Sequence, residues 1–235
     1  MSSVKFYNAI LAATLLVGLS LDSHAQGSRK PISITFLIDI SASQEDTISR
    51  TRKTTREFIG PILKSSDNKA AVVTFAGQPS IKQSLTGDPT QIDSALQKVK
   101  FEPPPGYIGG GVIIGSAPPT KRALALGQTA IWDAIWFTCE KIFVRPENKR
   151  TQAIILVTDG QDIISQRKLE DAIARAVQMN IIVYPIGVGE KQAVRHNADR
   201  LENLSAKTGG KAFFPTSEED MRNVLGQIEQ HLREL

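Results

Sequence analysis

Apolar segments with little internal polar alternation constrain the fold of this chain more than any other feature. They occupy residues 32–38, 70–75, 152–158 and 181–186. Stretches with helical spacing separate them, and strands buried on both faces are typical of parallel sheets that helices cover. Right-handed crossovers then predict an α/β fold, a doubly wound, mostly parallel sheet with helices on both faces.

Weaker patterns complete the predicted arrangement. Residues 81–85 alternate and are expected to form an edge strand, and residues 212–214 a short strand. In a doubly wound sheet, strand order 3-2-1-4-5 places the first strand beside the strand at 152–158. Helical spacing and end signals predict helices after Ser43, over 90–100, over 130–142, from Ser165 to Met179, over 199–208 and after Ser217.

Length and composition exclude several classes of protein. The 235 residues, 41% hydrophobic and 22% charged, suffice for a domain with its own core and exclude wholesale disorder. The net charge is +4, and no basic run interleaved with aromatic residues indicates a nucleic-acid surface. Cys139 is the only cysteine, so no internal disulfide can form. Its apolar, helical surroundings predict a buried, inert thiol rather than a reactive one.

The first 25 residues have the layout of a secretory signal. Lys5 gives a weakly positive start, residues 9–21 are apolar, and Ala25 ends a small-x-small cleavage site. The apolar run is short for a spanning helix, although an uncleaved N-terminal anchor is the alternative. We therefore expect an exported protein, periplasmic or secreted, with no membrane span after signal removal.

The expected domain begins after a short lead-in at residues 26–31 and covers residues 32–235. A Gly- and Pro-rich insert at about 101–128 interrupts it. Loops of this length are uncommon in compact domains and are usually functional or disordered. The insert is therefore either a flap beside a functional site or a variable surface segment.

Polar side chains gather where two predicted strands end. Asp39, Ser41 and Ser43 alternate after the first strand, so they face one way if the chain stays extended. Asp159 follows the strand at 152–158, and Thr129 opens the helix before that strand. The five side chains are expected at the switch point of the sheet. Two carboxylates and three hydroxyls, without sulfur or imidazole, suit Mg²⁺, with Mn²⁺ or Ca²⁺ as alternatives, and argue against Zn²⁺ or copper.

Each of these residues also has an ordinary structural interpretation. Ser43 and Thr129 could be N-caps of the helices that follow them. Asp159 with Gly160 is a common turn pair, and Asp39 alone could be a solvated strand end. Only their combination at one sheet edge favours a metal site.

These motifs resemble those of the von Willebrand factor type A domain. They are the Asp-Ile-Ser-Ala-Ser run at 39–43, the segment 127–135 around Thr129, and Thr-Asp-Gly at 158–160; segments 182–189 and 204–210 are also similar. The likeness covers about residues 32–233 and is greatest to stand-alone secreted bacterial members. The pattern Asp-x-Ser-x-Ser, Thr, Asp-Gly is known there as the metal-ion-dependent adhesion site. The insert departs from the compact family pattern.

The resemblance implies a role for each residue. Ser41, Ser43 and Thr129 would contact the metal directly, while Asp39 and Asp159 would act largely through water or as alternate ligands. An open coordination position would then accept an acidic residue of a protein partner. This implies protein binding and adhesion rather than catalysis.

A metal-dependent hydrolase that uses the same site is the main alternative. A phosphohydrolase with an aspartyl nucleophile would need an acid two residues after Asp39, where Ser41 stands. Gly-x-Ser-x-Gly is absent, and no nucleophile is paired with His196 in the sequence. A nucleotide-binding module lacks its Gly-x-Gly-x-x-Gly turn. A purely structural domain is disfavoured because the five-residue set is complete.

Overall fold

The computed structural model of the chain describes residues 30–235, except for residue 66 and residues 104–106, 110–111 and 114–127. The predicted signal segment and much of the predicted insert lie outside these residues. Within the insert, β4 (Tyr107–Gly109) and β5 (Val112–Ile113) pair antiparallel. In the part of the chain that is described, no helix is both long enough and apolar enough to cross a membrane.

Five strands form the main sheet of the described residues, in the order β3-β2-β1-β6-β7. β3 is antiparallel to β2 at one edge, and the other neighbouring strands are parallel. This confirms the predicted α/β fold and strand order. The strands are β1 (Ile32–Asp39), β2 (Lys69–Phe75), β3 (Pro79–Thr86), β6 (Thr151–Thr158) and β7 (Ile181–Gly187).

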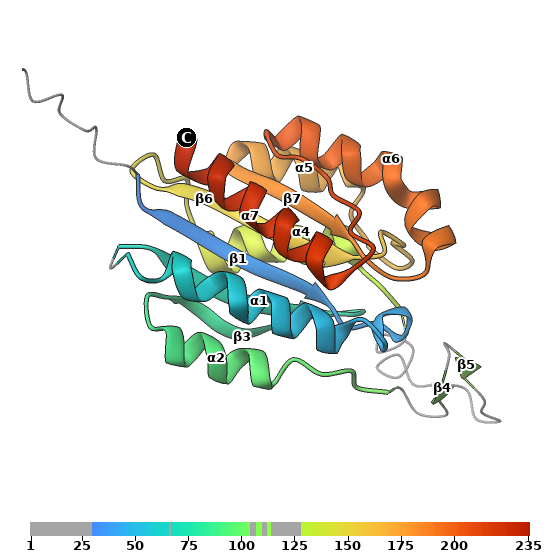
Figure 1. Cartoon of the computed structure of the whole chain (residues 1–235). Helices are drawn as coiled ribbons and strands as arrows, with labels where there is room; N and C mark the ends of the chain where they lie inside the picture. The colour runs from blue at the N-terminus through green and yellow to red at the C-terminus, as the bar shows by residue number, and fades with distance from the viewer. Residues whose placement is uncertain (1–29, 66, 104–106, 110–111, 114–127) are drawn as a thin grey trace, which may run out of the picture.

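Helices cover both faces of the sheet. One face packs against α1 (Ile48–Ile62), α2 (Pro89–Gln97) and α7 (Glu218–Glu234). The other packs against α4 (Ile131–Thr138), a π-helical turn that extends it (Cys139–Phe143), α5 (Leu169–Gln178) and α6 (Lys191–Thr208). Figure 1 shows α1 and α7 in front of the sheet and α4 behind it.

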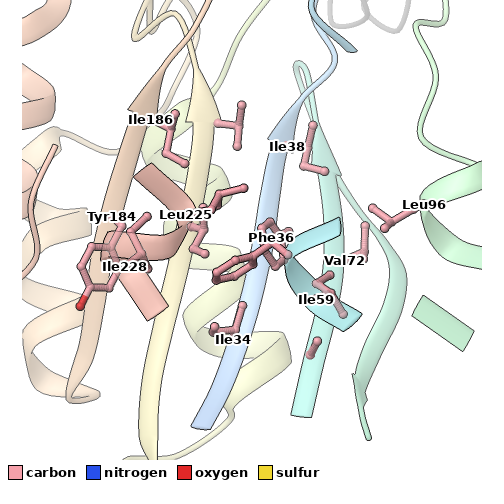
Figure 2. Packing of buried hydrophobic residues seen from close by; sticks show 14 of the residues in the cluster. Ile34, Phe36, Ile38, Ile59, Val72, Leu96, Tyr184, Ile186, Leu225 and Ile228 are labelled. Atoms are coloured by element: carbon pink, nitrogen blue, oxygen red, sulfur yellow. The ribbon is translucent and has the colours of Figure 1, made fainter. Parts of the chain in front are cut away.

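Alternation along the buried strands builds the two halves of the core. Ile34, Phe36 and Ile38 of β1 point to the face covered by α1 and α7, and Leu37 points to the other face. Figure 2 shows the first three among side chains that include Leu225 of α7. Every residue of β1 and β6 is buried, so the ends of both strands are held inside the protein.

Several element boundaries differ from the sequence prediction. After β1 the chain makes a 3₁₀ turn, Ala42–Gln44, and α1 begins only after Thr47. The N-cap of α5 is Lys168, not Ser165. Residues 212–214 form a single bridge from Phe213 to Ile186 rather than a strand. Phe213 bonds to Pro185 O and Gly187 N, and Pro185 has no N–H with which to extend the pairing.

Candidate functional site

The turn after β1 brings Asp39, Ser41 and Ser43 together at the carboxyl end of the sheet. Asp39 is only 2% exposed. Its Oδ1 accepts a hydrogen bond from Ser41 N at 2.9 Å, and its Oδ2 accepts one from Thr158 Oγ1 at 2.7 Å. Ser41 Oγ lies 3.3 Å from Ser43 Oγ, with Ser41 buried and Ser43 exposed. Asp39 is therefore not a solvated strand end, and Ser43 lies where this cluster opens to solvent.

Asp159 follows β6 and is 1% exposed. Its Oδ1 accepts a hydrogen bond from Gln161 N at 2.9 Å, which is the expected turn interaction. Its Oδ2 is buried and has no hydrogen-bond partner among the described residues. The turn therefore accounts for one carboxylate oxygen and leaves the other unexplained, although buried polar atoms are normally paired.

The two carboxylates lie close enough to affect each other's charge. Burial, and then repulsion from Asp159, raises the pKa of Asp39 from 3.8 to about 7, although hydrogen bonds from Ser41 and Thr158 oppose the rise. Among the described residues, no ion pair includes either aspartate. Two buried acids without a cation form a site where a positive charge would be strongly favoured.

Thr129 approaches the same edge of the sheet through its backbone. Its carbonyl oxygen accepts hydrogen bonds from Ile163 N at 2.8 Å and Ile164 N at 3.1 Å, in the loop that follows β6. Ala130 N donates to Ala76 O at 2.9 Å, just beyond the end of β2. Thr129, itself buried, is thus held between the ends of strands β2 and β6.

Other residues cap the helix that follows Thr129. Asp162 Oδ1 accepts from Ile131 N at 2.7 Å, and Ser165 Oγ accepts from Trp132 N at 3.1 Å. Thr129 is therefore not the N-cap of α4, whose cap position is Ala130. Ser43 is likewise not the N-cap of α1, because Thr47 takes that position. Both capping interpretations are wrong.

Sequence reasoning missed two residues that hold the site together. Thr158 donates to Asp39 Oδ2 and also accepts a hydrogen bond from Gly160 N at 3.1 Å, so it links the two acidic turns. Its position before Asp159, at the end of an apolar strand, was an available signal. Gln44 is buried and donates from Nε2 to Val188 O at 3.2 Å. That contact spans 144 residues and leaves no local pattern in the sequence.

A glycine permits the close packing behind Asp159. Gly189, at φ +134°, follows Val188 beyond β7. A Cβ atom there would lie 3.1 Å from Asp159 Cβ and 3.1 Å from Gln44 Nε2. Any larger residue would press on both, so this glycine helps to position the acid.

The donor set of the site is restricted in type. No group of three or more His, Cys, Asp or Glu side chains that could hold a metal occurs among the described residues. His196 lies on the exposed side of α6. A cation at this edge would therefore depend on two carboxylates and the hydroxyls, which are hard oxygen donors of the kind that Mg²⁺ and Ca²⁺ prefer.

Comparison with solved structures identifies proteins of the same fold. BatB from Bacteroides thetaiotaomicron is 17% identical, with a TM-score of 0.60 over 85% of this chain and 98% of that one. An aerotolerance-related membrane protein from Bacteroides fragilis is 16% identical, with a TM-score of 0.60 over 87% and 100%. The PilB minor pilin from Streptococcus sanguinis is 13% identical, with a TM-score of 0.61 over 88% and 62%. Identities this low establish the fold alone.

Comparison with protein families identifies the kind of domain. Two family models, both described as the von Willebrand factor type A domain, match residues 34–161 and 121–230. No curated protein sequence matches the chain. The first family match spans more than half of the chain and contains all five candidate residues. The chain belongs to the von Willebrand factor type A domain family.

Proposed function

We propose that this chain is a stand-alone, exported protein-binding module with a metal-ion-dependent adhesion site. Domains of this family are generally protein-interaction modules. In the proposed site, Ser41, Ser43 and Thr129 bind a divalent cation directly, and Asp39 and Asp159 hold it largely through water. The cation is Mg²⁺, with Mn²⁺ or Ca²⁺ as alternatives.

The observation that carries this proposal is the unpaired carboxylate charge at the site. Asp159 Oδ2 is buried without a partner, and the pKa of the adjacent Asp39 rises to about 7 through burial and repulsion from Asp159. A cation between these turns would give the orphan oxygen a partner and remove the repulsion. The residues present therefore fit a hard divalent ion.

The hydroxyl ligands suit binding of an acidic partner. A bound divalent ion supplies a positive charge with a coordination position that a carboxylate oxygen can fill. Neutral serine and threonine oxygens leave most of that charge uncompensated, and the exposed position of Ser43 leaves the site open to another protein. We propose that the partner is a protein that presents an acidic residue, encountered in the periplasm or outside the cell after the signal at 1–25 is removed.

Metal-dependent thermal stability tests the proposal. Mg²⁺ or Mn²⁺ should raise the melting temperature of residues 26–235, and the stabilisation should grow as RT ln(1 + [L]/Kd), about 2.7 kcal/mol at a hundredfold excess over Kd. The paired changes Ser41→Ala and Ser43→Ala should abolish the rise while the protein stays folded. Ser80→Ala with Ser84→Ala, on exposed positions of β3, is the matched control and should keep it.

An unchanged metal response in the Ser41/Ser43 double variant would remove these residues from the site. Phosphatase and esterase assays with and without Mg²⁺ separate a binding module from the hydrolase alternative. We expect no turnover; activity that disappears in Asp39→Ala would replace the binding function with catalysis.

A further inference from the structure

The helix that follows Thr129 is capped by a distant part of the chain. In α2 the N-cap residue supplies the cap itself, because Asp88 Oδ1 accepts a hydrogen bond from Thr90 N at 2.8 Å. The N-cap position of α4 is Ala130, which has no polar side chain. Its cap comes instead from the loop that follows Asp159, about thirty residues later in the chain. A loop that begins at a candidate metal ligand therefore also fixes the start of α4.

Asp162 connects this loop to α4. Its Oδ1 accepts a hydrogen bond from Ile131 N at 2.7 Å and a second from the Ser165 hydroxyl at 2.5 Å. The same Ser165 hydroxyl accepts a hydrogen bond from Trp132 N at 3.1 Å. A helix leaves its first backbone N–H groups without partners inside the helix. Here one carboxylate, and the hydroxyl bound to it, satisfy two of these groups.

The same loop also holds the backbone of Thr129. The N–H groups of the two residues directly after Asp162 both donate to Thr129 O, at 2.8 and 3.1 Å. Ile131 N, which donates to Asp162, lies two residues beyond Thr129. The chain is therefore held at Thr129 and just after it, by a loop that begins at Asp159. The spacing between these two candidate ligands depends on that connection.

We infer that Asp162 is a positioning residue for the proposed metal site, which sets Thr129 against the cation by fixing it to the loop of Asp159. This inference rests on the proposed function and adds a residue to it. Asp162 would act through Thr129 rather than as a ligand. Residues behind the direct ligands control metal affinity because they fix where the ligating atoms lie. A helix cap with no further role would stabilise the fold without altering metal affinity.

Metal affinity and fold stability, measured on the same variants, test the inference. Mg²⁺ dissociation constants come from melting temperatures of residues 26–235 over a Mg²⁺ titration, and metal-free stability comes from urea unfolding. Asp162→Ala should raise the dissociation constant about tenfold. Asp162→Asn should raise it by less than about threefold, because its amide oxygen can still accept a hydrogen bond from Ile131 N.

Asp88→Ala is the matched control. It also removes a carboxylate that caps a helix, but α2 follows the end of β3, which pairs with the start of β2 at the opposite end of the sheet. This variant should lower metal-free stability and leave the Mg²⁺ dissociation constant unchanged. A double-mutant cycle then tests the route through Thr129. In a Thr129→Ala background, Asp162→Ala should change the dissociation constant by less than about twofold.

A dissociation constant that Asp162→Ala leaves unchanged, or that Asp88→Ala raises equally, would overturn the inference. So would an Asp162→Ala effect of the same size with and without the Thr129 hydroxyl. If Asp162→Ala does not fold, Ser165→Ala decides, because it removes the hydroxyl bound to Asp162. It should raise the constant at least about threefold, and no change would overturn the inference. A wild-type protein that Mg²⁺ does not stabilise would overturn the proposed function, and the inference with it.

Discussion

The two ends of β1 bury polar side chains to a similar depth but satisfy them differently. At the amino end, Asn68 Oδ1 accepts from Ile32 N at 2.8 Å and its Nδ2 donates to Ile62 O at 2.9 Å. Arg150 donates to Ser33 Oγ at 2.8 Å and also to the carbonyl oxygens of Ile32 and Asp67. These groups are matched by the fold itself.

At the carboxyl end, the buried polar groups carry charge that the described residues do not match. Asp39 has hydrogen bonds from Ser41 and Thr158 but no cation, and Asp159 Oδ2 has no partner. The amino end also has one orphan, Gln152 Oε1, but that amide is neutral. Because an unpaired buried charge costs far more than an unpaired amide, the comparison distinguishes polar groups that stabilise the fold from groups that need a ligand.

The largest predicted effect lies at the amino end. Asn68→Ala should lower the free energy of unfolding by about 2–4 kcal/mol, because it leaves Ile32 N and Ile62 O without their partners inside the protein. The loss, measured by urea unfolding, should be the same with and without Mg²⁺. Asn148→Ala, an exposed amide at the same end, is the control and should change stability by less than about 0.5 kcal/mol. A loss that Mg²⁺ reverses would contradict the comparison.

A smaller effect of opposite sign is expected at the carboxyl end. In metal-free buffer at a pH above the raised pKa of Asp39, Asp39→Asn should raise the free energy of unfolding by about 1 kcal/mol. The change removes the cost of burying a charge and then the repulsion from Asp159, and this gain exceeds the weakening of the hydrogen bonds from Ser41 and Thr158. The same variant should lose most of the Mg²⁺ stabilisation. Asp46→Asn, an exposed acid on the same turn, should alter neither quantity.

Metal-free Asp39→Asn could instead be destabilised as much as Asn68→Ala. That result would show that the polar groups at the carboxyl end of β1 stabilise the fold, as those at the amino end do. Urea unfolding of both variants, with and without Mg²⁺, makes this comparison directly.

The parts of the molecule that follow strand periodicity were predictable from the sequence. The buried strands, their order and the position of Asp39 and Asp159 at one edge all follow from apolar runs that end in polar residues. The metal-binding role of the five residues stays a prediction, since it depends on a ligand rather than on the fold. The inert thiol at Cys139 also follows from an apolar helical pattern, and burial raises its pKa to about 12.

The predictions that were wrong concern contacts between residues that are distant in the sequence. Ser165 was expected to cap α5, but its hydroxyl caps α4, more than thirty residues earlier in the chain. The expected helix start at Ser43 was wrong because the chain first makes a 3₁₀ turn, whose Gln44 is held by Val188 beyond β7. The contact of Ser165 with α4 and the contact of Gln44 with Val188 both join residues far apart in the chain. Local sequence patterns therefore cannot predict either of them.

The smallest effect on the metal-free protein is expected for Ser43→Ala, and it gives the sharpest test. Ser43 is exposed, and among the described residues its hydroxyl has a single hydrogen-bond partner, Ser41 Oγ at 3.3 Å, which is a long hydrogen bond. The free energy of unfolding without metal should therefore change by less than about 0.5 kcal/mol. The Mg²⁺ dissociation constant, obtained from melting temperatures over a Mg²⁺ titration, should nevertheless rise at least about tenfold.

Ser49→Ala, an exposed serine in the first turn of α1, should change neither quantity. If Ser43→Ala leaves the Mg²⁺ dissociation constant unchanged, the Ser43 hydroxyl is not a metal ligand. Any cation would then be held by the buried groups alone. A change confined to Mg²⁺ affinity cannot result from a loss of fold stability. An exposed hydroxyl that does not support the fold can alter that affinity only by contacting the ion.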